Sequence, residues 1–339
     1  MIFQIASAPV HALGYPDAMN VVSWALAAML AWFIWQILRA AGLRSPSWML
    51  LCVASVCVGI YPAVWHVTGG AHAMGDLAMA AAVTAFCGRQ RLLANLSVPA
   101  YTALISILLL SAASSKISLF PLCGLLLVIA ARREFSSASP AEFGKSAVAL
   151  AAPWLIFLCP IGIWCWWQSG SPFGPVLAGA FGPSIYPAGF AQQTFEAARA
   201  ANGLALKEFV ELTAISNSPL VWLGAIGAVV GASLPTAIRA ILAGLLALQC
   251  SLIYFLLPHD ARFLGGLQYG LVIVFAMFAV PEFTARFASG RAVTAAAVLL
   301  LAPWLGVQIF YARQFIPVFP WDWKNLLFTS VTWRFIGIM

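Results

Sequence analysis

Long, uninterrupted apolar runs dominate this chain, and they leave few folds open to it. Residues 20–38, NVVSWALAAMLAWFIWQIL, are typical of these runs. About 20 residues of helix span the apolar core of a bilayer, whereas the strands of a membrane barrel alternate polar and apolar residues. Only 8% of the residues are charged, against about 25% in a soluble domain. We therefore expect an all-α polytopic membrane protein.

The apolar runs predict about ten transmembrane helices that form a single transmembrane domain over residues 1–339. They are expected at residues 20–38, 48–66, 76–88, 97–113, 117–131, 146–168, 219–235, 238–257, 265–282 and 293–312. The long connection at 169–218 begins rich in glycine and proline and then becomes amphipathic. Within it, residues 190–212 predict an interfacial helix on the outer side, either purely structural or acting as a lid over a site.

The charges on alternate connections predict the orientation of the chain. One side receives ten of the 17 basic residues and only three of the ten acidic ones. Because cytoplasmic loops are enriched in lysine and arginine, that side is expected to face the cytoplasm. The ten basic residues are Arg39, Arg44, Arg89, Arg91, Arg132, Arg133, Lys145, Arg239, Arg286 and Arg291.

This orientation starts the chain on the outer side. Residues 1–19, MIFQIASAPVHALGYPDAM, have neither the basic start nor the apolar core of a signal peptide. We therefore expect a further helix before Met1 that carries the chain across the membrane.

Composition argues against other classes of function. The net charge of +7 comes from basic residues scattered singly between apolar runs, which fits membrane topology better than nucleic-acid binding. All seven cysteines lie inside apolar segments and none forms a CxxC pair, so neither a disulfide framework nor a metal site is predicted. A transporter should hold polar groups at mid-membrane depth within paired repeats, and the sequence shows neither.

Polar residues gather instead in the connections of the predicted outer side. Ionisable residues at membrane depth are functional candidates, because partners must offset the cost of removing them from water. The pattern predicts a water-filled outer cavity that binds an anionic group, with positive charge from Lys116 and Arg262. The candidates for shaping the cavity or positioning an acceptor are His72, Asp76, His259 and Asp260.

Each candidate also has a structural interpretation. Asp76 opens a predicted helix, where a carboxylate caps free N–H groups. Lys116 can extend its ammonium to the membrane surface, and Arg262 can pair with Asp260 or with a lipid phosphate. Two histidines alone do not complete a zinc site.

Several stretches resemble one family, the GT-C fold glycosyltransferases that use polyprenyl-phosphate sugars. NVVSWALAAMLAWFIWQILRAAGL (20–43) resembles an early helix of that family, and YPAVWHVTGGAHAMGDLAMAAAVTAF (61–86) is similar to its outer loop and Asp-led helix. SSKISLFPLCGLLLVIAA (114–131) resembles its Lys-containing loop. SGSPFGPVL (169–177) resembles its G-N-P-F-x-P turn, and PHDARFLGGLQYGLVI (258–273) its R-[FY]-L-x-P segment.

The resemblance implies a multi-pass protein of the bacterial inner membrane with a periplasmic active face. It implies transfer of a sugar from a polyprenyl-phosphate donor to a hydroxyl or amine, with Lys116 and Arg262 on the donor phosphate. The partners would then be the lipid-linked sugar and membrane lipid. The family also allows a divalent metal ion, often in an acidic outer loop, but no cofactor is assigned here.

The chain departs from the family pattern in three places. Ser171 replaces an asparagine, and Gly265 and Gly266 stand where the family has a proline after R-[FY]-L. The family also opens with a helix and an acidic catalytic loop, which we expect before Met1, so no catalytic residue is assigned. Without that loop, the alternative is a non-catalytic lipid-binding or structural subunit of a membrane complex, in which a membrane partner supplies or replaces the missing part.

Overall fold

The computed structural model describes residues 19–57, 72–136, 138–172, 178–180, 182–187, 189–202, 206, 218–231, 233–257 and 265–281, with isolated positions between 295 and 306. These residues form eleven α-helices and one short 3-10 helix. The α-helices are α2 (Met19–Ala40), α3 (Pro46–Cys57), α5 (His72–Cys87), α6 (Arg89–Leu92), α7 (Val98–Ser115), α8 (Phe120–Phe135), α9 (Pro140–Ser169), α10 (Phe190–Asn202), α12 (Pro219–Val230), α13 (Thr236–Phe255) and α14 (Gly266–Phe278), and the 3-10 helix is η2 (Ile117–Leu119).

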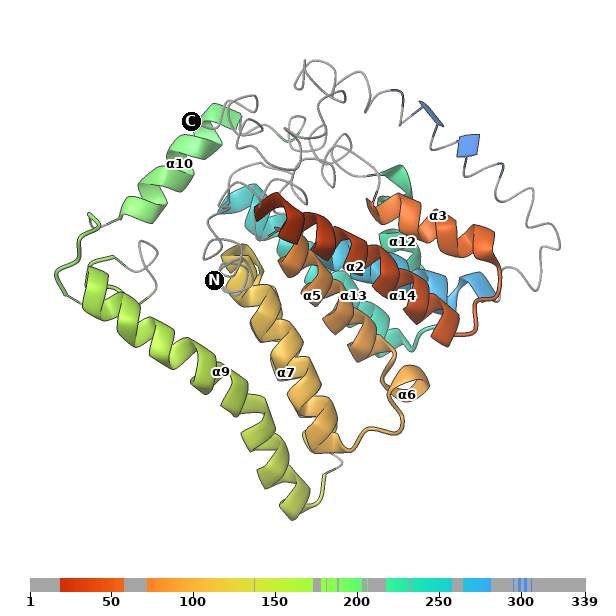
Figure 1. The fold of residues 1–339 in the computed structure, drawn as a ribbon, viewed down its shortest axis with the longest axis horizontal. Coiled ribbons are helices and arrows are strands. Elements are labelled where there is room, and N and C mark those ends of the chain that lie inside the picture. The colour runs from red at the N-terminus through yellow and green to blue at the C-terminus, as the bar shows by residue number, and fades with distance from the viewer. Residues whose placement is uncertain are drawn as a thin grey trace.

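The all-α fold predicted from the apolar runs is confirmed (Figure 1). Three helices, α7, α9 and α13, are long and apolar enough to cross a membrane, and five shorter apolar helices accompany them. Nine of the ten helices expected from sequence have a counterpart among the described residues. The tenth, expected at 293–312, lies almost wholly outside them.

Several helix boundaries differ from the sequence prediction, among them the starts of α9 and α5 and the ends of α8, α12 and α14. Helix α9 begins at Pro140 instead of residue 146, because Ser139 and Glu142 cap it reciprocally and a proline suits the first helical position. Helix α5 begins at His72, four residues before the predicted start at Asp76. Asp76 therefore lies in the second turn of α5 and does not cap its own helix.

Helix α5 lies at the centre of the bundle, where it packs against α2, α7 and α14. Its contact with α14 depends on two glycines one turn apart. A Cβ atom on Gly266 would lie 2.8 Å from Cβ of Met79, and one on Gly270 would lie 2.8 Å from Cβ of Val83. Both distances are shorter than packed carbon atoms allow, so these glycines let the two helix backbones approach closely.

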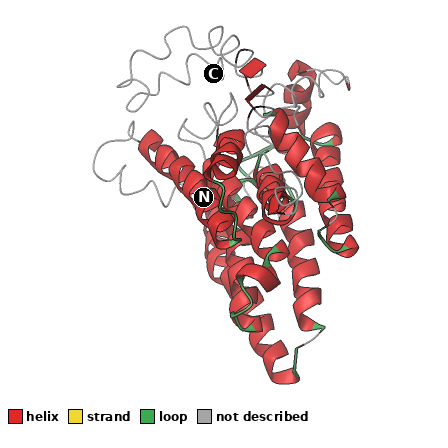
Figure 2. Ribbon diagram, turned by 90° about the vertical axis from the view of Figure 1, so that its right-hand side faces the viewer, coloured by secondary structure: helices red, strands yellow, loops and turns green. Residues whose placement is uncertain are grey.

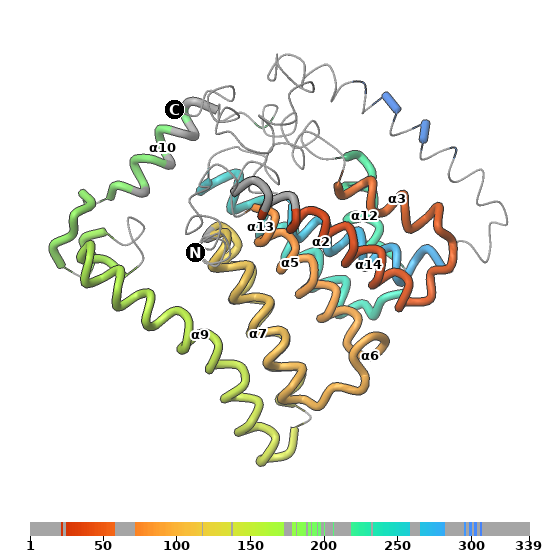
Figure 3. Tube along the Cα trace, viewed as in Figure 1, coloured from red at the N-terminus to blue at the C-terminus, as the bar shows by residue number. Residues whose placement is uncertain are grey.

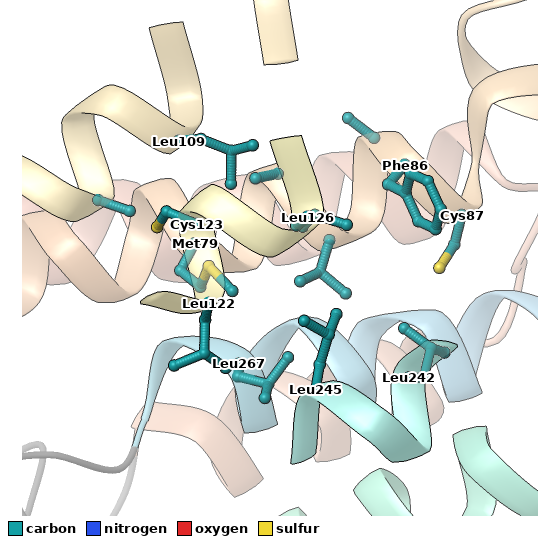
Figure 4. Packing of buried hydrophobic residues seen from close by; sticks show 14 of the residues in the cluster. Met79, Phe86, Cys87, Leu109, Leu122, Cys123, Leu126, Leu242, Leu245 and Leu267 are labelled. Atoms are coloured by element: carbon teal, nitrogen blue, oxygen red, sulfur yellow. The ribbon is translucent and has the colours of Figure 1, made fainter. Parts of the chain in front are cut away.

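The largest apolar cluster fills the space between α5, α7, α8, α13 and α14. Figure 4 shows Leu122 and Leu126 of α8 facing Leu267 of α14 and Leu245 of α13. All four side chains are fully buried. A second cluster joins α2 and α3 to the far face of α14. These two clusters thus hold together helices that are distant in sequence.

Helix α9 packs on this core through its first half. The Ser106 hydroxyl of α7 donates to the Leu150 carbonyl (2.6 Å) and accepts from the Trp154 indole N–H (3.0 Å). Beyond Trp154, α9 exposes large apolar side chains on every side, and α7 and α9 diverge toward the top of Figure 3. Trp164 and Trp167 are exposed near its end, as expected for aromatic residues at a membrane interface.

The predicted interfacial helix is present as α10, over Phe190–Asn202. It follows α9 and stands apart from the bundle in Figure 1. Gln192 and Glu196, which lie one turn apart, are exposed and hydrogen-bonded to each other at 2.8 Å. The sequence prediction extended this helix to residue 212, but residues 203–205 and 207–217 lie outside the described part of the chain.

Three arginines, Arg89, Arg91 and Arg133, gather at one end of the bundle, called the arginine end below. Arg91 donates to the carbonyls of Ala41, just after α2, and Met277, near the end of α14. Arg133 donates to the carbonyl of Phe86 in the last turn of α5. Basic side chains near helix C-termini satisfy free carbonyls and favour the helix dipole. That this end faces the cytoplasm stays a prediction.

Candidate functional site

The opposite end of the bundle, called the Asp76 end, carries a buried ion pair. Lys116, directly after α7, points its Nζ atom to Oδ1 of Asp76 at 2.8 Å. The side chains of Asp76 and Lys116 are 0% and 5% exposed. The idea that Lys116 extends its ammonium to the membrane surface is therefore wrong. Figure 2 shows the same helices after a 90° turn about the vertical axis.

Asp76 also stabilises the start of α14. Its Oδ1 atom accepts a hydrogen bond at 2.8 Å from the N–H of Gly266, the first residue of that helix. The first N–H groups of any helix have no partner within the helix, and a carboxylate there also favours the helix dipole. Asp76 thus caps α14 across the bundle instead of capping α5.

Glycine is required at the junction between Asp76 and α14. A Cβ atom on Gly265 would lie 2.8 Å from both carboxylate oxygens of Asp76. Gly265 also has a φ of +122°, which side-chain-bearing residues rarely adopt. On the other side of the pair, a Cβ atom on Gly75 would lie 3.2 Å from Cγ of Lys116. The charged groups are thus enclosed by backbone at close range.

Two buried glutamines extend this polar cluster. Gln268 of α14 accepts a hydrogen bond at 2.9 Å from the Gly265 N–H through Oε1, and its Nε2 donates to Oε1 of Gln249 on α13 at 3.0 Å. Gln268 is 0% exposed and Gln249 is 2% exposed. Buried amides are costly unless they are hydrogen-bonded, and these two meet that requirement through each other and Gly265.

At the Asp76 end, the buried negative charge of Asp76 is offset by a positive charge and a hydrogen-bond donor. Removing a carboxylate and an ammonium from water costs several kcal/mol per ion, roughly, unless close pairing and further hydrogen bonds offset it. Asp76 has both the Lys116 ammonium and the Gly266 N–H. The Asp76 carboxylate is held at the N-terminus of α14, and a phosphate reaching Lys116 would have to share the ammonium with it.

The structure describes three of the six predicted site residues. Asp76 and Lys116 are in direct contact, and His72 begins α5 one turn before Asp76 on the same face of that helix. His259, Asp260 and Arg262 lie outside the described residues. Arg262 precedes Gly265 by three positions, so covalent geometry limits the distance between their Cα atoms to roughly 11 Å.

Sequence reasoning missed the part that four residues play in this cluster. It noted Gly265 and Gly266 only as departures from a family motif, and it did not single out Gln249 or Gln268. A polar residue inside an apolar run was the available signal, because amides at membrane depth are unusual and need partners. Which partners they have depends on contacts between residues far apart in sequence.

No group of three His, Cys, Asp or Glu side chains that could hold a metal ion occurs in the part of the chain that the structure describes. The free cysteines among these residues are dispersed over several helices. The divalent metal allowed by the family resemblance therefore has no ligand set among the described residues.

An apolar groove lies elsewhere, between α3, α12 and α14. It has a volume of about 140 Å³ and is lined by Leu43, Trp48, Leu51, Cys52, Ser55, Leu220, Leu223, Gly224, Val272, Phe275, Ala276 and Val280. None of the residues of the Asp76 end lines it. It offers little polar chemistry, so the Asp76 end is the better candidate for a functional site.

Comparisons of the chain with protein-family models, with curated proteins and with solved structures give no match.

Proposed function

We propose that this protein binds a polyprenyl-phosphate sugar at the outer face of a bacterial inner membrane and takes part in sugar transfer from it, as GT-C glycosyltransferases do. The single observation that carries the proposal is the contact of Asp76 with Gly266. It holds Lys116 beside the start of α14, which begins four residues after Arg262 in the sequence.

In this proposal a second cation, Arg262, acts together with Lys116. Lys116 is 2.8 Å from Asp76, Asp76 is 2.8 Å from the Gly266 N–H, and Arg262 is three residues before Gly265. A planar guanidinium recognises phosphate oxygens in pairs, whereas an ammonium acts as a point charge. In a site of low polarity, charges positioned in advance stabilise a departing phosphate.

The mechanism assigns this chain's residues to donor binding. Arg262 would contact the phosphate directly, and Lys116 would contribute a positive charge that Asp76 partly neutralises. His72, His259 and Asp260 would line the acceptor side. The general base for the acceptor is not assigned to any residue of this sequence.

The test is the preference of the purified protein for a phosphate headgroup. A polyprenyl monophosphate and the uncharged polyprenol of equal length would be titrated in lipid nanodiscs, with inorganic phosphate as a third arm. We expect the wild type to prefer the monophosphate over the polyprenol by tenfold or more, and Arg262→Ala to remove most of that preference while Arg262→Lys keeps part of it.

Arg132 is the matched control for Arg262. It is exposed and lies in the last turn of α8, near the arginine end. Arg132→Ala removes the same charge without touching the Asp76 end, so its phosphate preference should equal that of the wild type. Equal binding of monophosphate and polyprenol by the wild type would reject the proposal, as would an unchanged preference in Arg262→Ala.

One observation favours a second candidate, a non-catalytic lipid-binding subunit of a membrane complex. Lys116 is buried and already paired, so its charge contributes to the internal packing of the bundle as well as to any ligand. If phosphate preference is present but no sugar is released from the native membrane protein with any lipid-linked donor, this second function is favoured. A structural role then explains the Asp76–Lys116 pair.

A further inference from the structure

We infer that the apolar groove between α3, α12 and α14 binds one acyl chain of an anionic phospholipid, and that the guanidinium of Arg44 contacts the phosphate of its headgroup. The two parts of a phospholipid match an open apolar groove with a cation at its mouth. The site is independent of the function proposed above, because no residue of the Asp76 end lines the groove.

The walls of the groove are almost entirely hydrocarbon. Trp48, Leu51 and Ser55 recur three or four positions apart, so α3 turns one face toward it. The Ser55 hydroxyl, the one hydroxyl among the lining residues, donates to the Cys52 carbonyl at 2.8 Å. Leu223 of α12 lines the groove and is 54% exposed, so the groove opens to the surface of the bundle. An open groove of this composition suits a hydrocarbon chain.

The close approach of α12 to α14 forms the inner part of the groove. A Cβ atom on Gly224 would lie 3.0 Å from Cγ2 of Val272, and one on Gly227 would lie 2.6 Å from Cε2 of Phe275. Glycines therefore let the two helices pack at short range. Gly224, Val272 and Phe275 all line the groove, so the missing side chain leaves an apolar recess where the two helices meet.

The turn between α2 and α3 places a cation beside this recess. Leu43 lines the groove and Arg44 follows it, so their Cα atoms are about 3.8 Å apart. The Leu43 N–H donates to the Leu38 carbonyl and the Gly42 N–H to the Arg39 carbonyl, each at 3.0 Å. This pair of hydrogen bonds ends a helix in a defined turn, and Arg44 leaves that turn as an exposed residue.

The cation lies at the end of the bundle where a headgroup is expected. Arg91 donates to the carbonyls of Ala41 and Met277, which joins the turn after α2 to the end of α14 at the arginine end. Trp48, in the first turn of α3, is of the residue type that favours headgroup depth. None of the ion pairs between described residues uses Arg44. Its guanidinium is thus available to a phosphate.

The experiment titrates the purified full chain in detergent with phosphatidylglycerol and with phosphatidylcholine that carries the same acyl chains. Native mass spectrometry counts the bound lipids and gives both affinities. We expect the wild type to prefer the anionic lipid about fivefold, the factor that corresponds to one basic residue near an anionic headgroup.

The headgroup contact is tested by changing the charge of Arg44. Arg44→Ala should remove most of the preference, and Arg44→Lys should retain it because the charge remains. Arg132→Ala is the matched control, since Arg132 is also exposed and lies near the same end of the bundle. A wild type that binds both lipids equally, or an unchanged preference in Arg44→Ala, would overturn the headgroup assignment.

The groove is tested by filling it. Leu51→Trp adds bulk to its wall, and because each buried methylene group contributes about fourfold to affinity, both lipids should bind at least fourfold more weakly. Their affinity ratio should not change. Leu50, the neighbouring residue on α3, is 59% exposed and does not line the groove, so Leu50→Trp should bind both lipids as the wild type does.

Equal lipid affinities in Leu51→Trp and Leu50→Trp would reject the groove as the acyl-chain site. If Leu51→Trp instead lowers the fraction of dimer in the same spectra and leaves lipid binding unchanged, the groove is a contact between two copies of the chain, and the inference is again wrong. The midpoint of thermal unfolding identifies a variant that does not fold. Leu223→Trp then fills the same groove from α12 and decides between these outcomes.

Discussion

The two ends of the helical bundle both carry charged residues, but they use them differently. At the arginine end, Arg89 is 3.4 Å from Glu134, their side chains are 13% and 10% exposed, and the arginine also donates to two backbone carbonyls. At the Asp76 end, the pair is buried and encloses a glycine junction. The first arrangement satisfies backbone carbonyls at the end of the bundle, whereas the second retains charges at a cost that apolar residues would avoid.

The comparison identifies which end to test for function. The charges at the arginine end have a structural explanation, because the last carbonyls of a helix have no partner within the helix. The Asp76–Lys116 pair also serves a helix end, because Asp76 accepts from the Gly266 N–H, but the pair is buried, and an apolar pair in a buried site is often at least as stable. We infer that its value lies in the geometry that it imposes on Gly265 and Gly266.

The largest expected effect comes from removing the charge of Asp76. In Asp76→Asn the Lys116 ammonium stays buried without its counter-charge, and we expect a loss of about 3–5 kcal/mol in the free energy of unfolding. The midpoint of thermal unfolding in detergent would show it. Replacing both partners, in Asp76→Leu with Lys116→Met, should recover much of the stability but not phosphate preference. A stable Asp76→Asn protein would contradict the importance of this pair.

The glycine junction gives the next largest effect. Gly266→Ala places a methyl group against Met79 and the Asp76 backbone, and overpacking of this kind costs about 1–3 kcal/mol. Gly244 on α13 is the control, because nothing lies within 4 Å of the Cβ position there. Gly244→Ala should unfold no earlier than the wild type. Equal unfolding temperatures for the two variants would show that the contact of α5 with α14 tolerates a side chain.

At the arginine end, Arg91→Met should have a smaller effect. It frees the carbonyls of Ala41 and Met277, and the net loss of a hydrogen bond is about 0.5–1.5 kcal/mol. Because Arg91 lies at the end of the bundle away from Asp76, the ratio of monophosphate to polyprenol affinity should not change. A changed ratio would mean that the two ends are coupled.

The sequence predicted the elements of the fold much better than the contacts between them. Apolar runs are local signals, and they located nine helices to within several residues. They could not show that Asp76 pairs with Lys116, 40 positions later, or that it caps a helix beginning 190 positions later. The predicted start of α5 at Asp76 was wrong because a charged residue was taken as a helix boundary, whereas α14 and Lys116 offset its burial.

The glutamines illustrate the same limit at the candidate site. Gln249 and Gln268 lie within runs whose apolar character predicts a membrane helix correctly. Their role depends on a hydrogen bond between α13 and α14, and on a glycine whose N–H needs an acceptor. Neither condition leaves a periodic pattern in the sequence.

The smallest expected loss of stability comes from Glu134→Gln at the arginine end. This variant converts a carboxylate to an amide, as Asp76→Asn does at the Asp76 end, so the two variants can be compared directly. Arg89 keeps the carbonyls of Leu93 and Leu96 and its contact with the Tyr101 ring, 4.6 Å from the guanidinium carbon. Glu134 is itself buried, but Arg89 keeps these acceptors when the carboxylate is gone, so the unfolding midpoint should fall less than in Asp76→Asn.

The two amide variants therefore form a matched measurement. If Glu134→Gln is nearly as stable as the wild type while Asp76→Asn is strongly destabilised, the Asp76 end depends more strongly on its carboxylate than the arginine end does. Equal destabilisation would mean that both ends carry the packing of the bundle alike. The Asp76 end would then lose its distinction as the place where charge is retained for a ligand.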